Sequence, residues 1–171
     1  MASSFQGTLD NTRVVAPPAE RHAAAYSDTY KKYCHRIYSL AFWMTDNELV
    51  AEQLTANTFL RACAGTLRPG TEQIDQAFLA EVRELMPIGT LTLNCAATPG
   101  NGALCANMKR VHLERSVTQL PATERLIFLL HDAEGYEHQK IARLLGVSEK
   151  ESRFGLHQAR VQLRELVIRM L

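Results

Sequence analysis

The residues whose types and spacing could do chemistry form a basic stripe near the C-terminus: Lys150, Arg153, His157, Arg160 and Arg164. On an α-helix these five side chains fall within about 80° of arc, because each residue advances by about 100°. Such a stripe can bind phosphate groups, and an arginine within it can hold a guanine edge through two hydrogen bonds. The same pattern is also typical of a solvated helix face, so the elements that carry the stripe bear on its interpretation.

Two helices joined by a sharp turn are predicted to position this stripe. The first covers residues of roughly 137–145, and Gly146 supplies the left-handed residue that ends a helix without a Cβ penalty. Ser148 and Glu151 have the spacing of a capping box at the start of the second helix. The apolar stripe of the second helix comprises Leu156, Ala159, Leu163, Leu166, Val167 and Met170. The pattern predicts a helix-turn-helix whose second helix is shaped to enter a DNA major groove.

The start of this second helix should meet the DNA. Its unpaired backbone N–H groups and positive dipole end suit a phosphate. Lys150 and Arg153 lie in its first turns, where a recognition helix meets base edges and backbone. The candidate DNA-binding residues are Lys150, Arg153, Phe154, His157, Arg160 and Arg164.

The composition is that of a globular protein without catalytic residues of its own. The chain of 171 residues is 46% hydrophobic and 22% charged, with a formal net charge of +1. The four cysteines lack the paired spacing of a zinc site, so we interpret them as reduced thiols of a cytoplasmic protein: Cys34, Cys63, Cys95 and Cys105. We find no signal peptide, membrane-spanning run, phosphate loop or catalytic constellation. The sequence therefore predicts no enzyme, no cofactor, no metal site and no membrane partner.

The periodicity predicts an all-α fold of two small helical domains joined by a linker, with the helix-turn-helix in the second domain. The predicted boundaries are a flexible lead at 1–26, a helical domain at 27–86, a linker at 87–107 and the helix-turn-helix domain at 108–171. The first domain should contain helices of roughly 28–44, 47–63 and 74–86. A capping box between Thr45 and Glu48 is expected to open the second of these, and Leu85 is expected to be buried in the third.

Over about a third of the chain, the C-terminal part has particular residue types at several separate positions in a characteristic order. They are Leu120-Pro121, Glu124-Arg125, Glu134-Gly135, Ile141-Ala142, Leu144 to Gly146 with Ser148, Ala159-Arg160 and Leu163-Arg164. This run resembles region 4, the DNA-reading domain of bacterial RNA polymerase sigma factors of the extracytoplasmic-function (ECF) type. The resemblance implies that the basic helix reads the minus-thirty-five element of a promoter. Ser152 departs from it, because the family usually has an apolar residue there, and this departure is expected to loosen the helix slightly.

The helix at 47–63 resembles the segment of sigma region 2 that grips the clamp helices of core RNA polymerase. The matching residues are Ala51, Glu52, Leu54, Thr58, Phe59, Leu60 and Arg61, whereas Gln53, Ala56 and Asn57 depart from the family pattern. The resemblance implies a docking face for core polymerase or an anti-sigma factor, with Phe59 expected to stay partly accessible. The candidate docking residues are Glu48, Glu52, Gln53, Asn57 and Phe59.

The helix at 74–86 departs further from the family. In an active sigma factor this helix reads and melts the minus-ten element, which needs stacking partners and a positive track for unpaired bases. Here it offers only Arg83, between Glu81 and Glu84, and no aromatic residue occurs between Phe78 and Phe128.

Three functions therefore remain open. One is a transcription initiation factor whose partners are core RNA polymerase and promoter DNA. A second is a sigma-like decoy that binds an anti-sigma factor without opening DNA. A third, a plain helix-turn-helix repressor, leaves the resemblance to region 2 unexplained.

Overall fold

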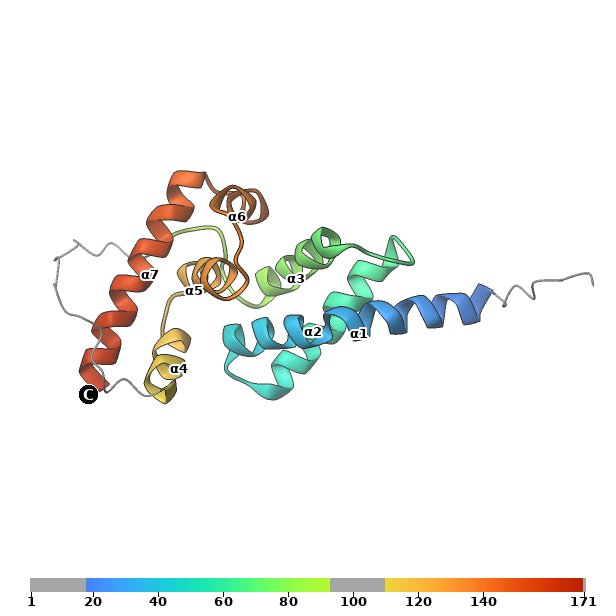
Figure 1. Cartoon of the computed structure of the whole chain (residues 1–171), viewed down its shortest axis with the longest axis horizontal. Helices are drawn as coiled ribbons and strands as arrows, with labels where there is room; N and C mark the ends of the chain where they lie inside the picture. The colour runs from blue at the N-terminus through green and yellow to red at the C-terminus, as the bar shows by residue number, and fades with distance from the viewer. Residues whose placement is uncertain (1–17, 93–109, 171) are drawn as a thin grey trace, which may run out of the picture.

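The computed structural model describes residues 18–92 and 110–170, and within these ranges the chain is helical without strands. The elements are α1 (Pro18–Thr45), α2 (Glu48–Ala64), α3 (Thr71–Leu85), α4 (Arg110–Thr118), α5 (Ala122–Phe128), the π-helical segment η1 (Leu129–Ala133), α6 (His138–Leu145) and α7 (Glu149–Met170). Figure 1 shows α1 to α3 on one side of the molecule and α4 to α7 on the other. The all-α prediction is confirmed, including the helix-turn-helix formed by α6 and α7.

The long helix α1 and the antiparallel helices α2 and α3 form the first bundle. The helix α1 packs mainly against α2, and its apolar residues at helical spacing are buried: Tyr33, Ile37, Leu40, Ala41 and Met44. Burial of such a stripe is the main stabilising contribution for an amphipathic helix. Because α1 begins at Pro18, residues 18–26 are helical and extend the helix predicted at 28–44 toward the N-terminus, and residues 1–17 lie outside the described part.

Two local predictions for the first bundle are wrong. The N-cap of α2 is Asn47, whose side chain accepts a hydrogen bond from Val50 N at 3.1 Å. The Thr45 hydroxyl instead donates to the carbonyl of Ala41 at 2.8 Å inside the last turn of α1, so the predicted capping box with Glu48 does not form. Leu85 is 54% exposed, because it is the last residue of α3 and lines an open groove between α2 and α3 rather than the core.

The second bundle places α7 across α4, α5 and α6. The helix α5 continues into the π-helical segment, where the amide of Glu134 bonds the carbonyl of Leu129 at 3.1 Å. Gly135, at φ 70°, then turns the chain toward α6. The π-helical segment lies directly before the helix-turn-helix and places the Asp132 carboxylate beside Arg160 of α7.

The two bundles share one hydrophobic core rather than standing apart. The cluster of buried apolar residues runs from α1 to α7 without a break. Arg125 of α5 donates to the carbonyl of Met44, at the end of α1, at 2.7 Å. After α3 the chain also bonds to α5, from Gly89 N to Thr123 Oγ1 at 3.2 Å. The predicted linker is therefore fastened to the second bundle over its first residues, while residues 93–109 lie outside the described part.

Asp75 of α3 is the polar centre of this contact. Its buried carboxylate accepts hydrogen bonds from Arg36 Nη2 and from the Tyr136 hydroxyl, each at 2.7 Å, and pairs with Lys140 Nζ at 3.2 Å. Arg36 belongs to the first bundle, and the other two partners belong to the second. Burial and the bond to Asp75 raise the pKa of Tyr136, so its hydroxyl stays a donor at neutral pH.

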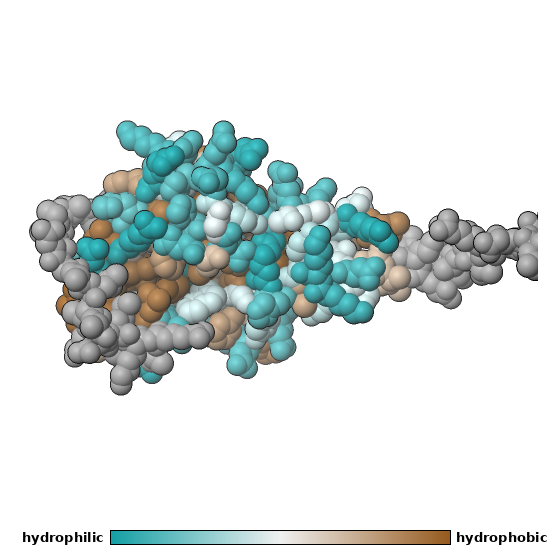
Figure 2. Space-filling view, viewed as in Figure 1, coloured by the Kyte–Doolittle hydropathy of each residue, from teal (hydrophilic) through white to brown (hydrophobic). Residues whose placement is uncertain are grey.

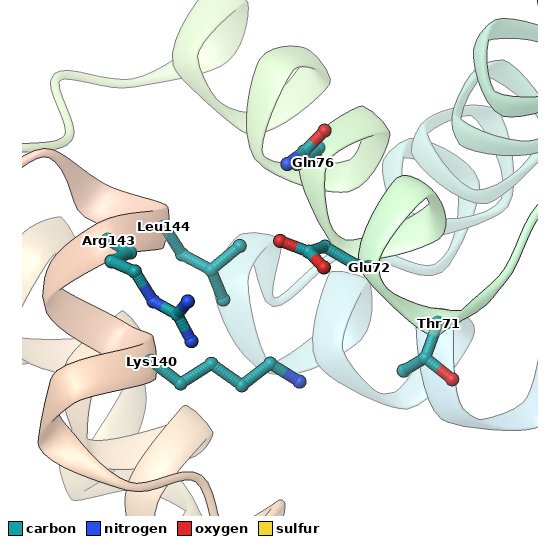
Figure 3. A pocket seen from close by; sticks show the side chains of 6 residues that line it. All are labelled: Thr71, Glu72, Gln76, Lys140, Arg143 and Leu144. Atoms are coloured by element: carbon teal, nitrogen blue, oxygen red, sulfur yellow. The ribbon is translucent and has the colours of Figure 1, made fainter.

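Beside Asp75, α3 and α6 form the two walls of a surface pocket (Figure 3). It is lined by Thr71, Glu72 and Gln76 of α3 and by Lys140, Arg143 and Leu144 of α6. At the other end of this contact, Arg83 Nη2 donates to the carbonyls of Leu144 at 3.2 Å and Leu145 at 3.1 Å. The C-terminal end of α6, where carbonyls lack helical partners, is thus capped by a side chain of the first bundle.

Candidate nucleic-acid interface

The turn between α6 and α7 has the predicted geometry. Gly146 adopts φ 73°, and its amide bonds the carbonyl of Ala142 at 2.9 Å, which closes α6. The amide of Ser148 donates to the Glu151 carboxylate at 2.7 Å, and the amide of Glu151 donates to the Ser148 hydroxyl at 3.1 Å. The capping box is therefore complete, and the backbone bond from Ser148, followed by its hydroxyl, lowers the pKa of Glu151.

The two faces of α7 separate as the sequence predicts. The apolar stripe lies against α4, α5 and α6, with Met170 half-buried and the other five residues buried: Leu156, Ala159, Leu163, Leu166 and Val167. On the outer face, all six candidate DNA-binding residues are exposed: Lys150, Arg153, Phe154, His157, Arg160 and Arg164. Figure 2 shows hydrophilic surface over most of this view and apolar surface at the end of the molecule where α4 and α7 lie.

Two of the arginines already have carboxylate partners. Arg153 Nη2 bonds Glu149 Oε1 at 2.6 Å, one turn earlier on α7. Arg160 holds Asp132 of the π-helical segment with two bonds, from Nη2 at 2.6 Å and Nε at 3.1 Å. Such solvent-exposed pairs contribute little to stability, so a phosphate or a base can replace the carboxylate at small cost. When Arg160 is bonded to Asp132, it links α7 to the π-helical segment, a role that its position on the basic stripe does not reveal.

Ser152 is fully buried at the first turn of α7, on the face turned toward α6. Its hydroxyl lies 3.0 Å from Nδ1 of His138, which begins α6 and is also buried. The departure from an apolar residue is thus matched by a partner, and the pair links the two helices of the motif. Burial, followed by the charges of His131 and Arg153, lowers the pKa of His138 and favours its neutral ring.

Gly155 is a packing residue that the sequence analysis missed. A Cβ at this position would lie 2.7 Å from Ile127 Cδ1 and 2.8 Å from Leu91 Cδ2. Its missing side chain allows α7 to approach both α5 and the segment that follows α3. A glycine inside an otherwise regular helix was the available signal, because glycine costs helix stability unless packing requires it.

The candidate docking face on α2 is only partly as expected. Glu48, Glu52 and Gln53 are exposed, and Asn57 is half-buried. Gln53 and Asn57 line a groove of about 270 Å³ between α2 and α3, together with Val50, Leu54, Glu81, Glu84 and Leu85. The sequence analysis missed Leu49 and Leu60, which are 74% and 62% exposed on the same helix.

The expectation that Phe59 stays accessible is wrong. Its side chain is 0% exposed, and its ring centroid lies 5.0 Å from that of Tyr30 on α1. The physical reason is that α2 packs against both α1 and α3 and therefore buries a wide arc rather than a single stripe. Phe59 belongs to the core of the first bundle and cannot touch a partner directly.

Two comparisons with known proteins bear on this site. Residues 110–163, which include α4 to α6 and most of α7, match the family model "Sigma-70, region 4". The chain is also 27% identical over 156 residues to the ECF RNA polymerase sigma factor SigE of Mycolicibacterium smegmatis, a match that covers 82% of this chain. The resemblance to ECF-type sigma factors is thereby confirmed. The chain spans 61% of the length of this curated relative.

No helix of residues 18–92 and 110–170 combines the length and the apolar character needed to cross a membrane.

Proposed function

We propose that this protein is a sigma-factor-like transcription initiation protein that binds core RNA polymerase through α2 and reads promoter DNA through α7. It acts in the cytoplasm without a cofactor, and the polymerase supplies the chemistry. The proposal rests first on α7, a capped helix with one face buried in its own domain and a basic face open to solvent. This is the arrangement by which a helix-turn-helix places side chains in a major groove.

Within α7 the contacts divide by position. Lys150 and Arg153 lie in the first two turns, where the helix end approaches base edges, so Arg153 is the residue that reads sequence. His157, Arg160 and Arg164 follow along the stripe and meet the phosphate backbone, which contributes affinity without sequence preference. Phe154 is 46% exposed beside them and offers an apolar contact for a thymine methyl group.

The first experiment measures promoter binding by the full chain at several salt concentrations. Arg153→Ala should cost about 1–3 kcal/mol of binding and relax sequence preference, whereas Arg160→Ala should weaken binding evenly and reduce the salt slope. Arg115→Ala is the matched control, because Arg115 is an exposed arginine on α4 away from the stripe. If Arg153→Ala and Arg160→Ala bind promoter DNA as tightly as Arg115→Ala and the unchanged protein, the stripe is only a solvated face.

A second candidate function is the sigma-like decoy, which binds an anti-sigma factor and does not open DNA. One observation favours it: Arg83, the basic residue of α3, is exposed but donates to two carbonyls of α6, so the second bundle engages the charge that a positive track along α3 would need. The groove beside Gln53 and Asn57 would then receive the anti-sigma factor.

Reconstituted transcription separates the two functions. An initiation factor co-purifies with core polymerase and supports run-off transcription from a promoter. A decoy binds an anti-sigma factor and yields no transcript, even from a template whose minus-ten region is already unpaired. Glu52→Lys should impair the protein contact in either case, with Glu165→Lys on α7 as a charge-matched control away from α2.

A further inference from the structure

Two histidines lie face to face beneath α7. The ring centroids of His131, in the π-helical segment, and His138, at the start of α6, are 4.6 Å apart with an interplanar angle of 26°. Nδ1 of His138 is 3.0 Å from the buried Ser152 hydroxyl, and Nδ1 of His131 is 2.8 Å from Asp132 Oδ1. Neither histidine belongs to the basic stripe, and neither is used by the proposed contacts to DNA.

These contacts join α7 to its support at two points. From Ser152 the chain of contacts passes through His138, His131 and Asp132 and returns to α7 at Arg160. Ser152 and Arg160 are eight residues apart, which is about 12 Å along a helix. The span between them includes Arg153 and His157, so these contacts, here termed the histidine brace, support the part of α7 that should face DNA.

The brace depends on the protonation state of His138. A neutral imidazole can either accept from or donate to the Ser152 hydroxyl, whereas an imidazolium has only donors and would bring a buried positive charge against the stacked ring of His131. Burial, followed by the charges of His131 and Arg153, lowers the pKa of His138, while Glu149 and Glu137 act in the opposite direction.

The charges on the remaining neighbours of His138 are engaged elsewhere. Asp132 is held by Arg160 and His131. On α3, the helix across α6, Asp75 pairs with Lys140, and Arg83 bonds the far end of α6.

We propose that His138 is a positioning residue for DNA reading: its neutral ring, held between Ser152 and His131, fixes α7 on α6, and protonation of that ring releases the helix and weakens promoter binding. This inference rests on the proposed function, because DNA binding is the activity that the brace supports. The sign follows from linkage. The stabilisation of α7 by the neutral His138 ring is complete above the ordinary histidine pKa of about 6.5. It is lost as the pH falls from that value toward the lowered pKa of His138.

This predicted loss of promoter affinity at low pH is opposite in direction to the ordinary effect of acid on DNA binding. A histidine on the DNA face gains positive charge as the pH falls, which strengthens phosphate contacts. His157 occupies that face, so the test is made in a His157→Gln background. In this background, acidification from pH 7.5 to 5.5 should weaken promoter binding by more than about twofold and by no more than about tenfold, because linkage allows at most a factor of about ten for the one pH unit below the unperturbed pKa.

His138→Asn is the informative variant, because an asparagine amide can occupy the Nδ1 position and bond Ser152 without titrating. It should bind promoter DNA with less than twofold change over the same pH range. His35→Asn, at an exposed histidine of α1, is the matched control and should retain the full acid loss. An acid loss of the same size in His138→Asn would overturn the proposal.

A second readout does not require DNA. Histidine-ring and backbone amide NMR spectra of the full chain should show the amides of Ser152 and Arg160 moving with the titration of His138. If the chemical shifts of the α7 amides do not change with the titration of His138, the brace is refuted, even if promoter binding is found. Coupled amides with no promoter binding at any pH would instead refute the proposed DNA-reading function and leave the brace intact.

Discussion

Among single carboxylates, Asp75, which lies at the contact between the two bundles, should have the largest effect on the free energy of unfolding. Its side chain is 4% exposed and holds Arg36 of the first bundle and both Tyr136 and Lys140 of the second. Asp75→Asn keeps the size of the side chain and removes its charge. The arginine and the lysine then face a neutral amide inside a half-buried contact.

The magnitude follows from the burial of the partners. Removing one member of a buried ion pair costs about 3–5 kcal/mol, because the remaining charge is left without compensation. The side chains of Arg36 and Lys140 are 21% and 30% exposed, so water compensates part of the loss, and we expect about 3 kcal/mol. Urea unfolding of Asp75→Asn should show this decrease in the free energy of unfolding. Small-angle scattering should show a larger radius of gyration, because the ionic contact between the bundles is weakened.

Glu72→Gln is the matched control for this prediction. Glu72 lies on the same helix and lines the same contact, but it is exposed (Figure 3). Its neutralisation should change the free energy of unfolding by less than about 0.5 kcal/mol. A loss below about 1 kcal/mol for Asp75→Asn, with unchanged scattering, would show that the apolar core alone holds the bundles together.

Three further predictions concern single side chains. Phe59→Ala should destabilise the protein by about 3–5 kcal/mol in urea unfolding, because a fully buried ring is replaced by a cavity; a loss under 1 kcal/mol would mean that the ring is not in the core. Ser148→Ala should cost about 1 kcal/mol by removing the cap of α7, and Ser148→Asp should restore most of it. Arg160→Ala should lower the free energy of unfolding by less than about 1 kcal/mol, since the pair with Asp132 is exposed, so a larger loss would make Arg160 structural rather than DNA-binding.

Features set by local chemistry could be predicted from the sequence. The turn is defined by Gly146 and by the pair of Ser148 and Glu151. Their hydrogen bonds join residues only three or four positions apart, so local sequence is enough to predict them. The buried stripe of α7 follows from 3.6-residue spacing alone. The fold class follows in the same way, since helical periodicity occurs on both sides of the linker and no alternating pattern competes with it.

Features set by which helices become neighbours could not be predicted in this way. Phe59 lies opposite one apolar stripe of α2 and was therefore expected at the surface, but a second neighbouring helix covers it. The bond between Arg160 and Asp132 joins residues 28 positions apart, and that between Arg36 and Asp75 joins residues 39 apart. Hydrophobic spacing carries no information about such pairs, because each member alone looks like an ordinary solvated charge.

The contact between α3 and α6 bears directly on the choice between the two proposed functions. If the proposed initiation function holds, the resemblance to sigma region 2 implies that α3 meets the minus-ten DNA, and in this structure Asp75 and Arg83 of that helix bind α6. Opening the contact would release Lys140 from Asp75 and Arg83 from the carbonyls of Leu144 and Leu145, so one movement would free positive charge on both α6 and α3. A decoy of the proposed kind would need no such movement, because the groove beside Gln53 and Asn57 is lined by residues of α2 and α3 alone. Under the proposed initiation function, the strength of the Asp75 contact would therefore set how readily α3 reaches DNA, while partner binding in the proposed groove between α2 and α3 would not depend on it.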